Sequence, residues 1–245
     1  MHQNDCNPDY IFQVDDLIPN WLLDYWESII INSDKWKYGL RGSPADVQQF
    51  FAIWISRPGE VPFVNDINGI GRTFHEMWTR EGLRSIIPDA RVDKIHRCHI
   101  NGTISSPHIL SIHQDWNPPN FWTLLFYLSG EDGDTVFFNE PDINQNETAF
   151  KEVHRIKFKR GRIAFFPSHY WHVGELPSCG FRTSLSLNYI LNDCDINLDI
   201  QKQRGITNKN IPDPDITDFL NEIERTDKYV NAHKKMQNSL LRGNN

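Results

Sequence analysis

Between residues 91 and 191 the sequence breaks into eight short β-rich runs, each ended by turn residues. The runs cover 91–101, 109–113, 122–129, 135–139, 152–158, 162–166, 170–173 and 181–191. Strands of this length and spacing are typical of an antiparallel sandwich or jelly roll, because a parallel sheet needs a helical segment between successive strands. The sequence therefore predicts a mainly β core.

Helical segments are predicted on the N-terminal side of this core. Residues 11–14 form a short β-like run, and from Pro19 to about residue 33 apolar side chains recur on one face of a helix. A second helix is predicted over 71–86 from the same kind of spacing. We therefore expect a β core with flanking helices.

The length of 245 residues suits one sizeable core, since about three quarters of the surface can be buried on folding. We interpret the chain as a single domain with helical and loop support over 1–90, the β core over 91–191, and a polar tail over 192–245. The tail includes a charged amphipathic helix near 216–230, which would either pack on the core or join two copies of the chain as a homo-oligomer.

The composition narrows the function classes. Asp and Glu (32) outnumber Lys and Arg (25), which gives a net charge of −7 without any basic run. Nucleic-acid binding needs concentrated positive charge, so we do not expect it as the main activity. The N-terminus lacks a secretory signal pattern, and no apolar run is long enough to span a bilayer. We expect a cytoplasmic protein without a membrane partner, in which the four cysteines are free thiols: Cys6, Cys98, Cys179 and Cys194.

His113-Gln-Asp115 is the first candidate for chemistry. Residues i and i+2 of a strand point to the same face, so the imidazole and the carboxylate can bind one metal ion. The motif alone is weak, because a chain of this composition contains about one H-x-D by chance. An ordinary hydrogen-bonded pair at a strand end is the alternative interpretation.

His172 follows 57 residues after Asp115, in the later half of the β region. Two histidines and one carboxylate leave three coordination positions open, which is the arrangement of non-haem Fe(II) oxygenases. His169 competes for the third position. We favour His172 because it lies in the middle of a run and precedes Val173 and Gly174, which allow close approach of backbone and ligand. A core histidine without a metal is the alternative.

The run 181–191 has one largely apolar face and one polar face, the latter formed by Arg182, Ser184, Ser186 and Asn188. The polar face would either meet solvent or line a cavity. In a cavity, Arg182 offers a planar donor fork to a carboxylate and Ser184 adds a hydroxyl. Tyr127, on the more polar face of 122–129, would reach the same carboxylate or serve as a core residue.

The order of these motifs resembles the Fe(II)/2-oxoglutarate-dependent dioxygenases, and within them the prolyl 4-hydroxylase-like branch with its stand-alone bacterial and phage members. The motifs are HQD at 113–115, FYLS with GEDGDTVFF at 126–138, HVG at 172–174 and RTS at 182–184. The resemblance covers roughly 91–191, and 11–33 resembles the first strand and helix of that branch. It implies a double-stranded β-helix, that is, a jelly-roll or cupin-like core.

The resemblance also implies the ligands of the site. Fe(II) would be held by His113, Asp115 and His172. The distal carboxylate of 2-oxoglutarate would be bound by Arg182, with help from Ser184, Tyr127 and, where relatives often carry a tyrosine, His99. The residues placed beside the metal motifs are candidates for substrate contact: Trp116, Asn117 and Trp171.

The implied reaction consumes O2 and 2-oxoglutarate, releases succinate and CO2, and hydroxylates an unactivated C–H bond, with ascorbate as a candidate reductant. The implied substrate is amino-acid or peptide-like, prolyl residues among them; another small metabolite is the alternative. A nucleic-acid demethylase is disfavoured, because that branch carries a second arginine where Asn188 stands. The intact set of ligands with Arg182 argues against an inactive binding module, and Asp115 argues against halogenation.

Overall fold

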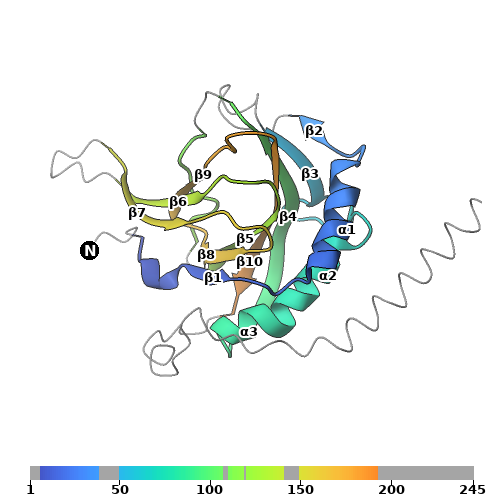
Figure 1. Ribbon diagram of the computed structural model, residues 1–245. Helices are drawn as coiled ribbons and strands as arrows, with labels where there is room; N and C mark the ends of the chain where they lie inside the picture. The colour runs from blue at the N-terminus through green and yellow to red at the C-terminus, as the bar shows by residue number, and fades with distance from the viewer. Residues whose placement is uncertain (1–5, 39–49, 107–109, 119, 141–148, 193–245) are drawn as a thin grey trace, which may run out of the picture. The chain divides into compact units, whose positions relative to one another are not determined.

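The computed structural model describes residues 6–38, 50–106, 110–118, 120–140 and 149–192 (Figure 1). All of them belong to one compact unit that spans residues 1–210. The predicted helix near 216–230, its role in joining two copies, and Cys194 lie outside the described residues. No helix in the described part of the chain is long and apolar enough to cross a membrane.

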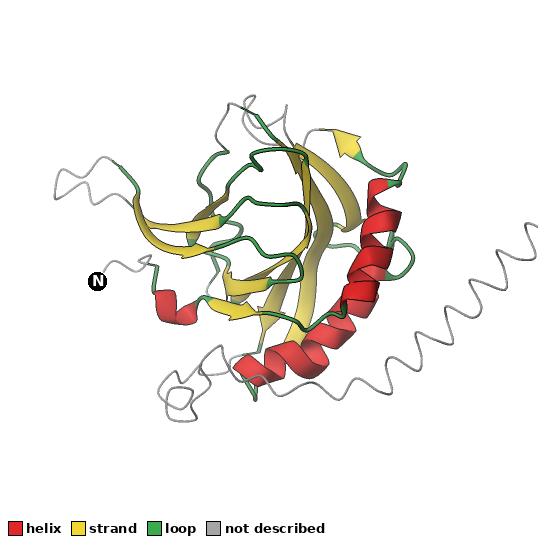
Figure 2. Ribbon diagram, in the orientation of Figure 1, coloured by secondary structure: helices red, strands yellow, loops and turns green. Residues whose placement is uncertain are grey.

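Two antiparallel sheets form the core of this unit (Figure 2). The larger sheet has the strand order β1 (Phe12–Val14), β8 (Ile163–Pro167), β5 (Phe121–Ser129), β10 (Phe181–Leu191), β4 (Val92–Ile104), β3 (Phe50–Ser56) and β2 (Lys37–Tyr38). The smaller sheet has the order β7 (Lys151–Ile156), β6 (Thr135–Asn139) and β9 (Trp171–Gly174). Apolar residues of both sheets pack together in one buried cluster that includes Tyr127, Phe137 and Phe166.

Helices cover the face of the larger sheet that points away from the smaller sheet (Figures 1 and 2). They are α1 (Asn20–Ile31), α2 (Ile70–Met77) and α3 (Leu83–Ile86), the last two joined by a π-helical turn over Trp78–Gly82, and a short 3-10 turn covers Pro8–Tyr10. Phe126 on β5 contacts Trp26 of α1 edge-on and stacks on Phe74 of α2 with ring centroids 4.5 Å apart. These buried rings join the helical layer to the sheet.

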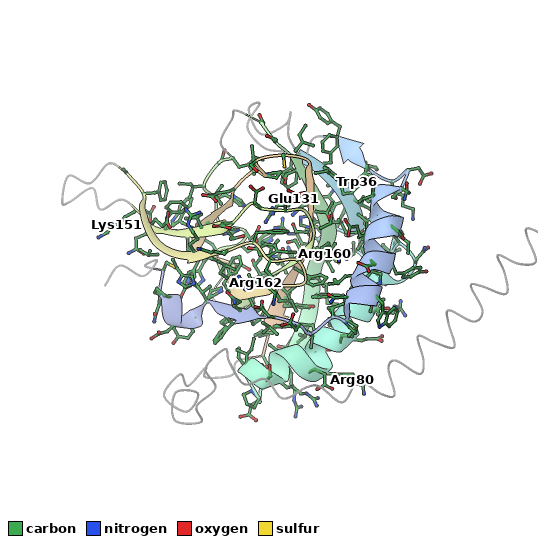
Figure 3. The ribbon with its side chains drawn as sticks, in the orientation of Figure 1. Trp36, Arg80, Glu131, Lys151, Arg160 and Arg162 are labelled. Atoms are coloured by element: carbon green, nitrogen blue, oxygen red, sulfur yellow. The ribbon has the colours of Figure 1, made fainter. Side chains whose placement is uncertain are left out.

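Ion pairs also attach the N-terminal segments to the turn before β8 (Figure 3). Arg160 binds Asp24 and Glu27 at 2.8 and 2.7 Å, and Arg162 binds Asp15 at 2.7 Å. The segment before α1 and the helix itself are thereby tied to the strand that packs beneath them.

The structure differs from the sequence prediction in two places. The run 109–113 is not a regular strand: residues 107–109 lie outside the described chain, and His113 makes one isolated antiparallel bridge with His172. Conversely, the sequence does not predict β2 and β3, yet they extend the larger sheet beyond β4. The predicted helix over 71–86 is observed as the continuous helical stretch that starts at Ile70.

Replacing Phe74 by alanine should destabilise the protein by about 3–5 kcal/mol, because it removes a fully buried ring that stacks on Phe126. Urea unfolding followed by fluorescence measures this free energy. Glu76→Ala, at an exposed position of the same helix, is the matched control and should change it by less than about 0.5 kcal/mol. A loss below about 1 kcal/mol for Phe74→Ala would show that the helical layer does not pack as described.

Candidate metal centre

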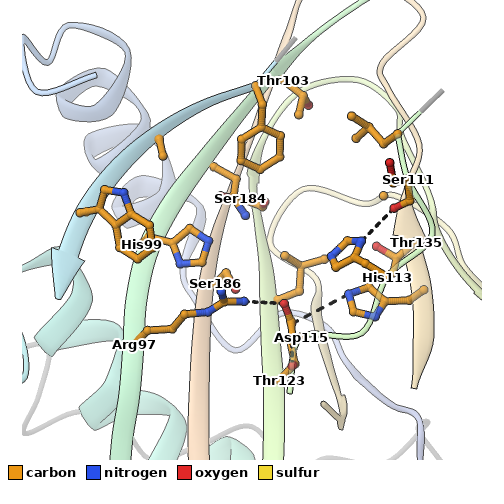
Figure 4. Close-up of a pocket in the computed structure, with 18 of the residues that line it drawn as sticks. Arg97, His99, Thr103, Ser111, His113, Asp115, Thr123, Thr135, Ser184 and Ser186 are labelled. Carbon is orange, nitrogen blue, oxygen red and sulfur yellow. Dashed lines mark hydrogen bonds and ion pairs between the residues drawn. The ribbon is translucent and has the colours of Figure 1, made fainter. Parts of the chain in front are cut away.

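His113, Asp115 and His172 come together at the wall of one cavity. Figure 4 shows His113 and Asp115 there. Their possible ligand atoms all lie within 4.8 Å of one another. The backbone fixes this arrangement: His113 and His172 exchange two N–H···O bonds of 2.9 Å, and the amide of Asp115 donates to the carbonyl of Ser168 at 3.0 Å. The loop before β5 is thus attached to β9 at the point where the three side chains meet.

Both imidazoles are oriented by backbone carbonyls. Nδ1 of His113 donates to the carbonyl of Ser111 and Nδ1 of His172 donates to that of Tyr170, each at 2.9 Å. This leaves both Nε2 atoms available to a metal ion. In metal sites the other ring nitrogen of a histidine ligand usually donates to a carbonyl or carboxylate in this way. Burial, with the neighbouring His113, lowers the pKa of His172 to about 4, so its ring is neutral and able to ligate near pH 7.

His169 does not join this cluster. Its ring packs edge-on against Tyr170 with centroids 4.9 Å apart, and its carbonyl accepts a hydrogen bond from the side chain of Gln114. In the described part of the chain, the residue that clusters with His113 and Asp115 is therefore His172, the candidate that the sequence favours.

The Asp115 carboxylate is held by three side chains from the larger sheet. Arg97 on β4 pairs with Oδ1, while Thr123 on β5 donates to Oδ2 at 2.8 Å and Asn188 on β10 approaches the same oxygen at 3.5 Å. Burial raises the pKa of Asp115, but the Arg97 guanidinium and the two histidines outweigh burial and hold the pKa well below its usual range. The carboxylate is ionised and its orientation is fixed before any metal binds.

Arg97 is a site residue that the sequence analysis missed. It lies two residues before His99 on the same face of β4, and its cross-strand partner is Asn188, whose Oδ1 accepts a hydrogen bond from the Arg97 guanidinium. The period-two pattern of the predicted strand contained this signal, because it places Arg97 and His99 side by side. The ion pair between Arg97 and Asp115 is visible only in the tertiary structure.

Replacing Arg97 by methionine keeps the aliphatic stem but leaves Asp115 buried without its counter-charge. We expect a loss of about 3 kcal/mol in the free energy of unfolding of the apo protein, because a buried carboxylate without a counter-charge destabilises the folded state. Bound Mn(II) would restore a counter-charge, so the metal-induced rise in Tm should be larger in Arg97→Met than in the wild type. Calorimetry measures both; Arg84→Met, at an exposed position, is the control. Equal losses with and without metal would contradict this role.

A cavity of about 960 Å³ opens beside the three candidate ligands. Its floor consists of cross-strand pairs between β4 and β10, namely Thr103 with Arg182, Asn101 with Ser184, and His99 with Ser186. Alternation along both strands turns these six side chains to the same face, so the polar face of 181–191 lines a cavity and does not meet bulk solvent.

Arg182 is the most unusual group in this cavity. Its side chain is 5% exposed, and its Nε and one terminal nitrogen have no hydrogen-bond partner among the described residues. The guanidinium carbon lies 5.1 Å from the ring centroid of Tyr127, and burial lowers the pKa of Arg182. A buried cation with unused donors is costly, so this site suits an anionic ligand, and a carboxylate matches its fork.

A glycine in the turn between β5 and β6 allows the Arg182 side chain to pack closely against the backbone. Gly133 has φ +107°, and a Cβ there would lie 2.8 Å from Cδ of Arg182 and 2.8 Å from the carbonyl of Glu175. A larger residue would be strained and would collide with the arginine. The glycine of the G-x-x-G-D-T motif is thus explained by close approach to Arg182.

The other predicted 2-oxoglutarate contacts have distinct surroundings. Ser184 and His99 line the same cavity as the three candidate metal ligands and Arg182. His99 lies 5.0 Å from the Trp54 ring, and burial lowers its pKa to about 3. Tyr127 is fully buried under Arg182, and its hydroxyl donates to Thr135 at 2.7 Å. Contact of these three residues with 2-oxoglutarate stays a prediction.

Trp116, Asn117 and Trp171 are not among the described residues that line the cavity. Trp116 packs against His96 and Phe121 with ring centroids 4.3 and 5.8 Å apart. Trp171 alternates with His172 on β9 and contacts Phe150 at 5.1 Å. Their contact with a substrate therefore stays a prediction without support from this geometry.

No family model and no curated protein matches this sequence. The fold is similar to two solved structures of non-heme alpha-ketoglutarate-dependent enzymes from nogalamycin biosynthesis. The carbocyclase SnoK has 10% identity, a TM-score of 0.53 and coverage of 77% of this chain and 81% of its own. The epimerase SnoN has 12% identity, a TM-score of 0.52 and coverage of 77% and 80%. A Pseudomonas putida prolyl-4-hydroxylase has 15% identity, a TM-score of 0.45 and coverage of 74% and 92%.

These likenesses concern the fold. They confirm the predicted double-stranded β-helix with flanking helices, to which the two antiparallel sheets correspond. The sequence identities are too low to transfer a substrate or a reaction outcome.

Proposed function

We propose that the protein is an Fe(II)- and 2-oxoglutarate-dependent oxygenase that hydroxylates an unactivated C–H bond of an amino-acid or peptide-like substrate. One observation carries the proposal: His113, Asp115 and His172 open onto the same cavity as the buried, partly unpaired guanidinium of Arg182. A metal centre and a carboxylate receptor in one cavity are what a metal-chelating dicarboxylate co-substrate requires.

The donor set fits iron. Two neutral imidazoles and one ionised carboxylate form a 2-His-1-carboxylate set that leaves coordination positions open, whereas a structural zinc site would be closed by a fourth protein ligand. Bound Fe(II) would supply the O2 activation and oxidising power that C–H hydroxylation needs. The protein keeps the ligands deprotonated and oriented through Arg97, Thr123 and the two backbone carbonyls.

The remaining side chains position the co-substrate. Arg182 would receive the distal carboxylate of 2-oxoglutarate, with the Ser184 hydroxyl beside it, and the keto-acid end would face the three metal ligands. Oxidation of one C–H bond to C–OH is then balanced by one O2 and by conversion of 2-oxoglutarate to succinate and CO2. The buried setting of Arg182 excludes water from the charged pair and thereby strengthens it.

Another small metabolite is the second candidate substrate, with the same co-substrate chemistry. The fold neighbours SnoK and SnoN are named as a carbocyclase and an epimerase, so proteins of this fold do not all hydroxylate. The product therefore has to be measured directly. Gain of one oxygen atom indicates hydroxylation, loss of two hydrogens indicates ring closure or desaturation, and an unchanged mass with altered stereochemistry indicates epimerisation.

The test is aerobic incubation of the protein with Fe(II), 2-oxoglutarate, ascorbate and a panel of amino acids, peptides and other metabolites. We expect succinate formation that depends on Fe(II) and on one class of panel compounds, with a product heavier by one oxygen atom. The His172→Ala protein is the matched negative control. Absence of succinate above that control, together with absence of Fe(II) or Mn(II) binding, would refute the proposal.

A further inference from the structure

The cavity continues beyond the metal centre to β3 and β2, the two strands that the sequence analysis missed. Register explains this: Trp54 pairs with His99, Ala52 with Asn101 and Phe50 with Thr103, so each extends a row of the cavity floor. Lys37 and Tyr38 on β2 and Arg57, just after β3, line the outer part. We call Lys37, Tyr38, Trp54 and Arg57 the outer subsite.

We infer that the outer subsite binds an anionic group of the substrate, and that the substrate is a carboxylate- or phosphate-bearing small molecule with a planar or apolar body. The inference rests on the proposed function, because it concerns the second ligand of the same cavity. The inference specifies that the amino-acid or peptide-like substrate carries an anionic group.

Charge is the first argument. Among the described residues that line the cavity, five side chains are charged, and Asp115 is the single carboxylate; the other four are cationic, namely Lys37, Arg57, Arg97 and Arg182. Arg97 is paired with Asp115, and Arg182 is assigned to 2-oxoglutarate. Lys37 and Arg57 form no ion pair with any described carboxylate; Glu60 accepts a hydrogen bond from the Arg57 backbone, not from its guanidinium. On a chain with a net charge of −7, this excess of positive charge would attract anions into the cavity.

The aromatic residues supply the second argument. The Arg57 guanidinium carbon lies 5.4 Å from the centroid of the Trp54 ring. Stacking on an aromatic ring orients a guanidinium while its in-plane N–H groups stay available to a carboxylate or phosphate. Tyr38 is 57% exposed at the cavity, although tyrosine rings are usually buried further. Aromatic rings beside free cations suit a ligand that is apolar in one part and anionic in another.

Unsatisfied polar atoms on β4 provide the third argument. His99 Nδ1, Asn101 Oδ1 and Thr103 Oγ1 are buried, lie on the cavity face, and have no hydrogen-bond partner among the described residues. His99 and Thr103 are only 4% and 2% exposed. Because buried polar groups are normally satisfied, this row implies a polar ligand between the Arg182 end and the outer subsite.

The experiment uses three matched probes: 1-naphthoate, 1-naphthyl phosphate and the uncharged 1-naphthamide. Their affinities for the full-length protein loaded with Mn(II) and 2-oxoglutarate are measured by calorimetry, so that Arg182 is already occupied. We expect at least one anion to bind about 10-fold or more tightly than the amide. Preference between carboxylate and phosphate identifies the anionic group.

Arg57→Gln and Lys37→Gln should each weaken anion binding by roughly 5- to 30-fold, while amide binding and 2-oxoglutarate affinity stay unchanged. Arg80→Gln is the matched control, because Arg80 is exposed on the helical layer that covers the opposite face of the larger sheet (Figure 3). Equal binding of the three probes, failure of both anions to bind, or unchanged anion binding in the Arg57→Gln, Lys37→Gln double variant would overturn the inference.

Succinate formation in the same protein separates this inference from the proposed function. Anion binding that depends on Arg57, in a protein that neither binds Fe(II) or Mn(II) nor forms iron-dependent succinate, would refute the oxygenase and leave the outer subsite standing. Succinate formation together with equal binding of the three probes would refute the outer subsite alone. With an active substrate in hand, Arg57→Gln should raise the KM for that substrate and leave both kcat and the KM for the co-substrate unchanged.

Discussion

Arg182→Ala should weaken the binding of 2-oxoglutarate by about 30- to 1000-fold, which corresponds to roughly 2–4 kcal/mol. The guanidinium is buried and has unused donors, so its bonds to a carboxylate would form away from competing water. Titration of the Mn(II)-loaded protein with 2-oxoglutarate measures the loss directly. In the succinate assay, the apparent KM for this co-substrate should rise in parallel.

Two comparisons make the Arg182 result specific. Arg182→Lys should do less harm than Arg182→Ala, because the charge remains although the planar fork is lost. The apo form of Arg182→Ala should keep its Tm or gain stability, since the substitution removes a buried cation whose donors are partly unpaired. An unchanged affinity for 2-oxoglutarate in Arg182→Ala would place the distal carboxylate elsewhere.

Local sequence patterns predict a strand of this fold where the residues of that strand and its flanking turns are sufficient to identify it. The predicted bounds of β6 and β10 are those that the structure shows. Flanking turn residues mark the ends of both strands, and period-two alternation also marks β10. The same alternation places Arg182 and Ser184 on one face without knowledge of their surroundings. The three residues of the candidate metal cluster are also singled out by their sequence pattern, since His113 and Asp115 are two residues apart and His172 lies within a short β run.

The outer half of the cavity could not be predicted in this way. β2 has two residues, too few for any periodic signal, and β3 is the largely apolar sequence FFAIWIS, which does not alternate. The place of β3 follows from its pairing with β4, a strand more than forty residues later in the sequence, and β2 in turn pairs with β3. Lys37, Trp54 and Arg57 therefore gave no sign that they belong to the cavity.

The segment before Asp115 shows a related limit. Residues 110–113 have a β-like composition, but the chain makes one bridge, at His113, where a strand is predicted. A single bridge is enough to position His113 beside His172, and residues 110–112 lie outside the sheet. Composition cannot distinguish these two outcomes, because both place the same residues in extended backbone.

His172→Ala should lower Mn(II) affinity by more than about 100-fold and abolish succinate formation, since loss of a direct ligand exceeds the 10- to 100-fold effect of losing an outer partner. The apo protein should stay folded, because the variant loses one hydrogen bond, to the Tyr170 carbonyl, and a buried ring beside Phe137 and Phe166. Asp115→Ala is a less selective test, because it also removes the partner of Arg97. Calorimetric titration with Mn(II) gives the affinity.

The matched control for His172→Ala is His169→Ala, which removes the histidine that packs against Tyr170 outside the cluster. It should retain Mn(II) affinity and turnover. A metal bound about 1000-fold above its Kd adds about 4 kcal/mol to the free energy of unfolding, so Mn(II) should raise the Tm of wild type and His169→Ala but not of His172→Ala. If His169→Ala lost the metal-induced rise and His172→Ala kept it, the third ligand would be His169, and the backbone bridge between His113 and His172 would have only a structural role.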